Sequence, residues 1–268
     1  MLHLDDWPVE QRRNIIGVFT DIDDTLTTHG AITTDALQAL ADLKAAGLHV
    51  IPITGRPVGW AEPLAARWPV DAIVVENGAV TFKIGTQPGY LLPKVLSKIY
   101  QQDAATRAYN RARMARIAQQ VLAQVPTAVL SRDHAGRETD LAFDYNEFEN
   151  VPLETVQAIL AVLHQAGMQT SVSSIHIHGC FGQFDKWLGA QWIVRELFQR
   201  DLATELDKWV FIGDSGNDQA MFQHFTHTVG VANIRKFESQ LAHLPHYITT
   251  SERGAGFTEV VRALLNSK

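Results

Sequence analysis

The chain has 268 residues, of which 46% are hydrophobic, and a formal net charge of −6 at pH 7. This composition is typical of a globular protein with an ample core, and the negative charge argues against a basic nucleic-acid-binding surface. A single cysteine, Cys180, excludes an intrachain disulfide. No apolar run is long enough to span a bilayer, and the charged N-terminal segment does not resemble a signal peptide. We therefore expect a cytoplasmic protein without nucleic-acid or membrane partners.

The first part of the chain alternates between strands and helices. The predicted elements are a strand at residues 15–21, a helix from Thr33 or Thr34 to Ala46, a strand at 49–54, a helix near 58–68 and a strand at 72–75. Strands separated by helices indicate right-handed βαβ units and a parallel sheet.

The middle of the chain lacks this rhythm. The predicted elements are a long, mostly helical stretch from Pro93 to Val125 with a break near Asp103, a hairpin of Thr127–Arg132 and Thr139–Tyr145, a helix at Leu153–Gln165 and a strand at Gln169–His178. This αββαβ pattern predicts an inserted domain at residues 83–181.

The first pattern then resumes. The predicted elements are a helix at 185–199, a strand at 208–213, a helix at 217–224, a strand at 227–232 and a helix at 256–266. We expect an α/β fold: a Rossmann-like three-layer core with a parallel sheet, formed by residues 1–82 and 182–268, and an inserted α+β cap domain.

Acidic and hydroxyl side chains follow the predicted core strands. Asp21 and Asp23 end the first strand, Thr54 ends the second, and Asp214 and Asp218 follow a later one. The carboxyl ends of parallel strands form the ligand crevice of such sheets, so these side chains should share one pocket. Clustered carboxylates repel one another unless a hard cation such as Mg²⁺ lies among them.

Each of these features has a functional and a purely structural interpretation. Of the Asp21 and Asp23 carboxylates, one can attack an electrophile while the other moves a proton, but strand-to-helix loops also favour Asp for turns. Thr54 suits a phosphoryl oxygen or caps a turn, and Lys186 binds phosphate or is a solvated surface lysine. The loop Gly213–Asp218 is more specific, because a turn explains one of its acidic or amide side chains but not the set.

Together and in this order, the segments resemble the haloacid dehalogenase superfamily of phosphohydrolases. Asp21-Ile22-Asp23-Asp24-Thr25 is similar to its first motif, Thr54-Gly55-Arg56 to its second, Lys186 to its third and Gly213-Asp214-Ser215-Gly216-Asn217-Asp218 to its fourth. The inserted block resembles the type IIB cap of sucrose-phosphate, mannosyl-phosphoglycerate and Cof-type phosphatases and of a phosphomannomutase family. Asp24 replaces a glycine that is common in many members.

The resemblance implies roles for the matching residues. Asp21 would attack phosphorus and form an aspartyl phosphate, and Asp23 would protonate the leaving alcohol and then activate water. Mg²⁺ would bind the Asp21 carboxylate, the Asp23 backbone carbonyl and Asp214, with Asp218 nearby. The phosphoryl oxygens would be held by Thr54, Gly55 and Lys186. The candidate substrate contacts are Arg56, Asn77, His176, His178 and Asn217.

Two features of the inserted block are less specific. His176 and His178 should face the same side of a strand, where they bind substrate, bind a metal or lie on an exposed sheet face. The first helix of the inserted block is predicted to be basic, and it either forms a solvated surface or steers an anionic substrate. Its basic residues are Lys94, Lys98, Arg107, Arg111, Arg113 and Arg116.

The sequence thus predicts a Mg²⁺-dependent phosphatase for a small phosphorylated metabolite, with a sugar phosphate as the favoured substrate. The alternatives are a phosphomutase on the same scaffold and a receiver-like signalling module that is phosphorylated on Asp21. If the inserted block closes over the crevice, its hinges are predicted near Val80–Lys83 and Gly179–Phe184, where Gly179 and Gly182 permit rotation.

Overall fold

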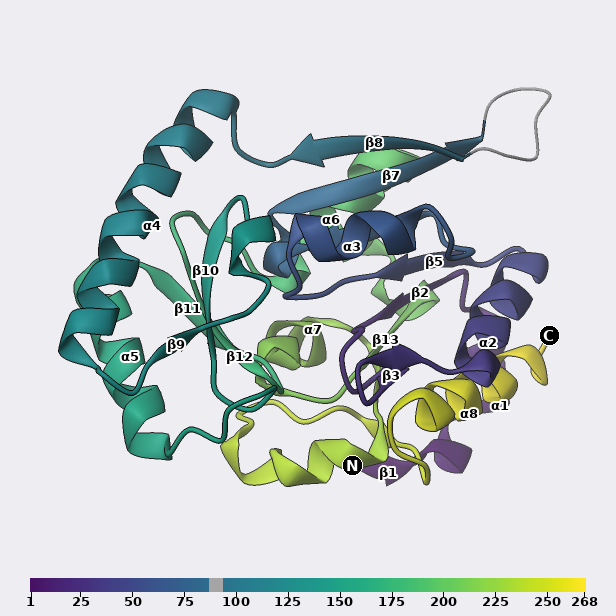
Figure 1. Ribbon diagram of the computed structural model, residues 1–268. Helices are drawn as coiled ribbons and strands as arrows, with labels where there is room; N and C mark the ends of the chain where they lie inside the picture. Colours follow the sequence, from purple (N-terminus) through teal and green to yellow (C-terminus); the bar gives the residue numbers. More distant parts are fainter. Residues whose placement is uncertain (87–93) are drawn as a thin grey trace.

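The computed structural model describes residues 1–86 and 94–268, and its centre is a parallel six-stranded sheet (Figure 1). The strand order is β1-β15-β14-β13-β2-β5, and each neighbouring pair is parallel. Its strands are β1 Leu2–His3, β2 Gly17–Thr20, β5 His49–Pro52, β13 Trp209–Gly213, β14 His227–Gly230 and β15 Tyr247–Ile248. Apolar runs such as β2 and β13 are buried along their whole length, as expected for parallel strands covered on both faces.

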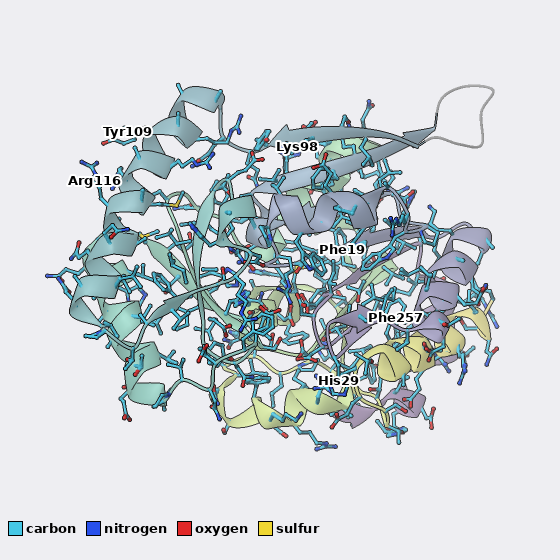
Figure 2. The ribbon with its side chains drawn as sticks, in the orientation of Figure 1. Phe19, His29, Lys98, Tyr109, Arg116 and Phe257 are labelled. Carbon is cyan, nitrogen blue, oxygen red and sulfur yellow. The ribbon has the colours of Figure 1, made fainter. Side chains whose placement is uncertain are left out.

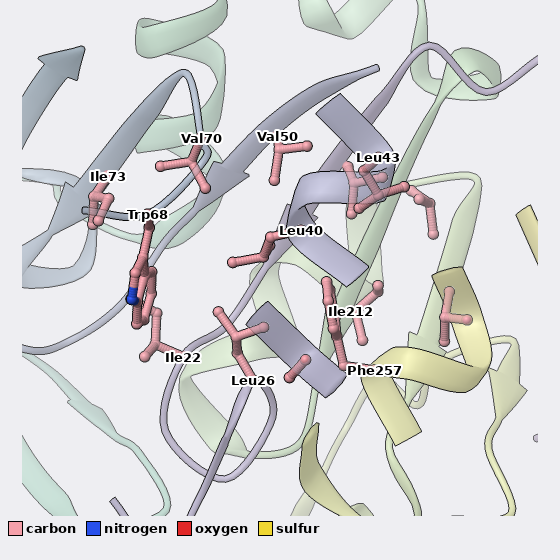
Figure 3. Packing of buried hydrophobic residues seen from close by; sticks show 14 of the residues in the cluster. Ile22, Leu26, Leu40, Leu43, Val50, Trp68, Val70, Ile73, Ile212 and Phe257 are labelled. Carbon is pink, nitrogen blue, oxygen red and sulfur yellow. The ribbon is translucent and has the colours of Figure 1, made fainter. Parts of the chain in front are cut away.

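Helices cover both faces of this sheet and give three layers. The helices are α1 Val9–Arg13, α2 Thr34–Ala45, α3 Val58–Ala65, α6 Lys186–Phe198, α7 Gln219–His224 and α8 Arg253–Leu265. Val18 of β2 belongs to a core cluster with α2, α3 and α8, whereas the next residue, Phe19, belongs to a cluster with α6 and α7. Figure 3 shows part of the first cluster, which includes Leu40 of α2, Phe257 of α8 and Ile212 of β13. The predicted three-layer α/β fold is confirmed.

A three-stranded antiparallel sheet extends the core. It consists of β6 Ala72–Val75, β7 Val80–Thr86 and β8 Lys94–Tyr100, and a bridge between Ile53 and Val74 joins it to the parallel sheet. The helical prediction is therefore wrong for residues 94–100, because pairing with β7 along the whole of β8 outweighs local helix preference. Pro93 lies outside the described residues. The helix begins only at α4 Ala104–Gln124, capped by Asp103, where the break was predicted.

The inserted block forms a second antiparallel sheet, covered by α4 and α5. The sheet has the order β11-β12-β10-β9, and its elements are β9 Val129–Leu130, β10 Asp140–Asp144, α5 Leu153–Gln165, β11 Gln169–Val172 and β12 His176–Cys180. Most buried apolar residues of α4, α5 and this sheet form a third cluster, whereas Cys180 at the end of β12 belongs to the first core cluster. The predicted hairpin and the helix α5 are confirmed.

The strand predicted at residues 169–178 is in fact two strands joined by a tight turn. The Ser173 N–H donates to the His176 carbonyl at 2.9 Å, and Ser173 Oγ accepts the N–H groups of Ile175 and His176 at 3.3 and 3.0 Å. A serine side chain that binds local backbone in this way reverses the chain. The turn brings β11 and β12 together as antiparallel neighbours.

The predicted domain boundary at residue 83 falls inside β7, which is paired on both sides. Leu96 and Tyr100 of β8 pack against the first core cluster, so this part of the predicted insertion packs with the core. The chain crosses into the second sheet after Tyr100 and returns near Phe181, where Gln102 Nε2 donates to the Phe181 carbonyl at 2.9 Å. Within residues 1–86 and 94–268, no helix combines the length and apolar character needed to cross a membrane.

Candidate active site

Four segments far apart in the sequence meet at the carboxyl edge of the parallel sheet. Asp21 and Asp23 follow β2, Thr54 follows β5, and Asp214 begins the loop after β13. Lys186, the first residue of α6, reaches the same place. The edge of the sheet therefore collects the side chains that the sequence motifs predicted to act together.

Lys186 links two of the acidic segments. Its side chain is fully buried, and Nζ donates to Asp21 Oδ1 and to Asp218 Oδ1, the latter at 2.6 Å. The side chain of Asp185 caps α6 by accepting the Leu188 N–H at 2.7 Å, which fixes the turn that carries Lys186. The alternative of a solvated surface lysine is therefore wrong.

Asp218 and Asp214 are held by hydrogen bonds that fix the fourth-motif loop. Asp218 Oδ2 accepts the N–H groups of Asp214 and Ser215 at 2.9 and 3.0 Å. The Asp214 carboxylate accepts from Thr25 Oγ1 at 3.2 Å and from Asn233 Nδ2 at 3.0 Å. Sequence reasoning missed Asn233, although it lies just beyond β14 and the rule that sites gather at strand ends could have found it.

The charges of this cluster do not balance. Carboxylate oxygens of Asp21, Asp214 and Asp218 lie within 4.8 Å of one another, and Lys186 is the ammonium group among them. Burial raises the pKa of Asp21 to about 8, with Asp218 and Asp23 adding to the rise and Lys186 opposing it, and burial raises the pKa of Asp214 well above its usual range. Three carboxylates facing one ammonium fit a divalent cation with oxygen ligands, because further positive charge would keep them ionised.

The second motif forms a floor beside Asp21. Thr54 and Gly55 line a small cavity together with Asp21 and Asn217. Asn77 has a φ of 52°, donates its N–H to the Thr54 carbonyl at 3.0 Å and accepts from Asn217 Nδ2 at 3.1 Å. Asn217 thus lines the cavity, whereas Asn77 lies beside Gly55, with Nδ2 3.3 Å from where a Cβ atom of Gly55 would be.

Arg56 connects the core to the inserted block. Its guanidinium donates to both oxygens of Asp23 at 2.8 to 3.0 Å, and also to Glu147 at 2.6 Å and Asp133 at 3.3 Å. Glu147 in turn contacts His176 Nε2 at 2.8 Å. The Asp23 carboxylate therefore faces Arg56 and the second sheet rather than the cluster around Asp214.

His176 and His178 face the same side of β12, as predicted, and their ring centroids are 5.9 Å apart. Both are buried and line the small cavity beside Asp21, so an exposed sheet face is wrong. Asp144, Glu147 and His176 lie close enough to hold a metal, but the Asp144 oxygens accept backbone N–H groups of its own loop and Glu147 is paired with Arg56.

Sequence reasoning missed the charged contacts that join the second sheet to the core. Arg137 donates to Asp140 at 3.0 and 3.1 Å and to the Gly55 carbonyl at 3.0 Å. The Glu76 carboxylate accepts from the backbone of Glu138 at 2.9 Å and from Thr139 at 2.6 Å. These residues lie on loops and short strands without a local pattern, so their pairing follows only from the docked arrangement.

Two cavities adjoin Asp21 and Asp23. The inner one, between Asp21 and β12, has a volume of about 10 Å³, which is room for one water molecule. The outer one, of about 380 Å³, has Asp23 and Arg56 in its wall. It lies between the hairpin of β3 Thr27–Thr28 and β4 Ala31–Ile32 and the loop at residues 146–148.

Asp24, which departs from the common motif, has a φ of 57°. This left-handed conformation favours glycine, which accounts for the glycine usual at this position. Its carboxylate pairs with Arg253 at 2.7 Å in the wall of the outer cavity.

The basic residues predicted on one cap helix divide between two elements. Lys94 and Lys98 belong to β8, and Lys98 pairs with Glu138 at 2.6 Å. Arg111 and Arg116 are exposed on α4, and Figure 2 shows Arg116 and Tyr109 pointing outward from this helix. Arg107 and Arg113 lie over the rings of Tyr100 and Phe181.

Comparisons with known proteins give the fold and the family of the chain. No curated protein matches the chain in a sequence search. A protein of Thermoplasma acidophilum superposes with a TM-score of 0.67 at 17% identity, over 94% of this chain and 98% of that one. The sucrose-phosphatase of Synechocystis sp. PCC6803, solved with sucrose and phosphate, gives 0.62 at 17% identity over 94% and 98%. A HAD/COF-like hydrolase of Plasmodium vivax gives 0.66 at 15% identity over 97% and 100%.

These structures share the fold of the chain, and a family relationship follows from the sequence itself. The profile of the sucrose-6F-phosphate phosphohydrolase family matches residues 15–263, which include all four motifs. This match excludes the receiver-like signalling module. The chain therefore belongs to the sucrose-6F-phosphate phosphohydrolase family and is a phosphatase of the haloacid dehalogenase superfamily.

Proposed function

We propose that the chain hydrolyses the phosphate ester of a small sugar through a phosphorylated Asp21 and with the help of Mg²⁺. The observation that carries this proposal is the bond from buried Lys186 to both Asp21 and Asp218, beside Thr54. Phosphoryl transfer needs positioning and neutralisation of spread negative charge, and these groups supply both.

The metal would be held by Asp21 and Asp214, with the Asp23 backbone carbonyl as a further ligand. Asp218 already accepts three hydrogen bonds, so its main role would be to anchor Lys186 and the loop. A bound Mg²⁺ would neutralise charge on the phosphoryl oxygens and keep the carboxylates ionised.

The aspartates would act in two steps. A carboxylate oxygen of Asp21 attacks phosphorus, the ester P–O bond breaks, and the leaving oxygen takes a proton from Asp23. Asp23 then takes a proton from water, the water oxygen attacks phosphorus, and the bond to Asp21 breaks. Asp23 can donate only when protonated, so Arg56 must release its carboxylate as the substrate enters.

The outer cavity would hold the sugar. It adjoins Asp23, the proton donor to the leaving alcohol, and it offers both donors and acceptors from Arg56, Asn146 and Glu147. The related Synechocystis structure contains sucrose and phosphate, which supports a sugar ester as the substrate. A small phosphorylated metabolite is thus the proposed partner, and the cytoplasmic location expected from the sequence stays a prediction.

The second sheet would act as a cap that opens and closes over this site. The unit would be residues 104–181, because β8 packs with the core. Closure would exclude water and set which substrates fit. The hinge predicted at Val80–Lys83 lies within β7, which is paired with strands on both sides. We therefore place the first hinge of the cap at residues 101–103. The second hinge stays at Gly179–Phe184, as predicted.

The test is phosphate release from a panel of phosphorylated sugars, sugar acids and nucleotides, with Mg²⁺ and with excess EDTA. We expect sugar phosphates to be hydrolysed fastest, and no release after chelation. Interconversion of two sugar phosphates without phosphate release would instead favour the phosphomutase. Full activity in EDTA after dialysis would contradict the metal-dependent mechanism.

A further inference from the structure

His178 presents one ring nitrogen to the inner cavity without a protein partner. Its Nδ1 lies 2.9 Å from Asp140 Oδ2, whereas its buried Nε2 has no hydrogen-bond partner among the residues that the structure describes. The side chain is 4% exposed. A buried polar atom left unpaired costs free energy unless a ligand or water satisfies it.

The free nitrogen faces the phosphate-binding floor. A Cβ atom built on Gly55 would lie 2.8 Å from His178 Nε2, so the ring lies directly on this glycine. His178 also lines the inner cavity with Asp21 and Thr54. A ligand atom that reaches Nε2 would therefore lie beside the phosphoryl group, on the side of the cap.

The neighbours of His178 determine which nitrogen carries the proton. Burial raises the pKa of Asp140 to about 6, and the two hydrogen bonds from Arg137 oppose this rise. At neutral pH Asp140 is therefore a carboxylate, which can only accept from Nδ1–H. Burial, together with the charge of Arg137, holds the pKa of His178 well below its usual range. The ring is therefore neutral, with its proton on Nδ1 and a lone pair on Nε2.

We propose that His178 Nε2 accepts a hydrogen bond from a substrate hydroxyl next to the ester carbon, and so selects phosphate esters that carry one. This inference rests on the proposed phosphatase function. A lone pair does not bind an ionised phosphoryl oxygen, because both groups are acceptors, whereas an alcohol O–H supplies the missing proton.

His176 has a different role in this account. Its Nε2 is already bonded to Glu147, the partner of Arg56, so it positions that acid instead of contacting substrate. The sequence predicted both histidines as substrate contacts, but their hydrogen-bond partners give them different roles. They offer a matched pair of variants on one strand.

The test compares 2-hydroxyethyl phosphate with ethyl phosphate, which differ by one hydroxyl. Each ester is measured as a competitor of p-nitrophenyl phosphate, so that a value is obtained even where its own turnover is slow. We expect the wild type to favour the hydroxylated ester about tenfold, the worth of one good hydrogen bond.

His178→Asn keeps a donor for Asp140 but lacks a group at Nε2, and should reduce this preference to about one. His178→Gln, which can place an oxygen near Nε2, should recover part of it, and His176→Asn should retain it.

The proposal would be overturned if wild type and His178→Asn showed the same preference for the hydroxylated ester. It would also be overturned if His176→Asn alone lost this preference. NMR of ¹⁵N-labelled histidine gives a readout independent of turnover: we expect the Nδ1–H tautomer, and an Nε2–H tautomer or a charged ring would contradict the inference. Hydrolysis of p-nitrophenyl phosphate that depends on Asp21 tests the phosphatase function separately, so the two failures can be told apart.

Discussion

Replacing Lys186 by methionine should destabilise the protein and abolish turnover for one electrostatic reason. The ammonium is fully buried and contacts Asp21 and Asp218, so its loss leaves two buried carboxylates without their cation. Removal of one partner from a buried ion pair costs about 3–5 kcal/mol of unfolding free energy. Methionine fills much of the same volume, so lost packing should contribute less than lost charge.

The assay is urea unfolding in chelator at neutral pH, together with hydrolysis of p-nitrophenyl phosphate. The matched control is Lys208→Met, since the Lys208 side chain is 43% exposed and its ion pair with Glu205 is long, at 4.0 Å. This variant should change stability by less than about 0.5 kcal/mol. Adding Asp218→Asn to Lys186→Met removes one of the unpaired charges and should restore part of the stability but no activity. A loss below about 1 kcal/mol in Lys186→Met, or an active double variant, would refute this reasoning.

Three further outcomes are expected. Asp214→Asn should raise the Mg²⁺ concentration for half-maximal activity at least about tenfold, because one anionic ligand is lost; an unchanged requirement would exclude Asp214 as a ligand. Gly216→Ala should raise KM for sugar phosphates more than for p-nitrophenyl phosphate, because the new Cβ would lie 2.7 Å from the Val172 carbonyl of the cap; equal effects would argue against closure at this contact. Burial, with the charge of Asp140 adding to it, raises the pKa of Glu76 to about 7. The folded state therefore binds the Glu76 proton more tightly than the unfolded state does. The wild type should lose stability relative to Glu76→Gln as the pH rises from about 4.5 to 7. The slope should approach about 1.4 kcal/mol per pH unit, and parallel pH curves for the two proteins would contradict it.

The core and the side chains of its candidate active site could be predicted because strand ends and short motifs are local features. Asp21, Thr54 and Asp214 each follow a buried apolar run, and Lys186 follows a capping aspartate at a helix start. The parallel sheet then brings them together without further information.

Strand β8 and the second sheet were harder to predict because their structure depends on tertiary pairing. Residues 94–100 become a strand only because β7 lies beside them, and Ser173 turns the chain within an apparently continuous strand. The charged contacts of Arg137 and Glu76 have no sequence pattern, since their partners are set by how the cap docks on the core.

Phosphate release by Asp21→Asn tests the central claim most directly. Asparagine keeps the shape of the side chain but lacks the attacking charge, so we expect at least about a thousandfold loss of turnover while circular dichroism shows an intact fold. The assay uses p-nitrophenyl phosphate with saturating Mg²⁺, which removes cap selectivity from the comparison. Near-normal turnover by the purified, folded variant would contradict the assignment of Asp21 as the nucleophile.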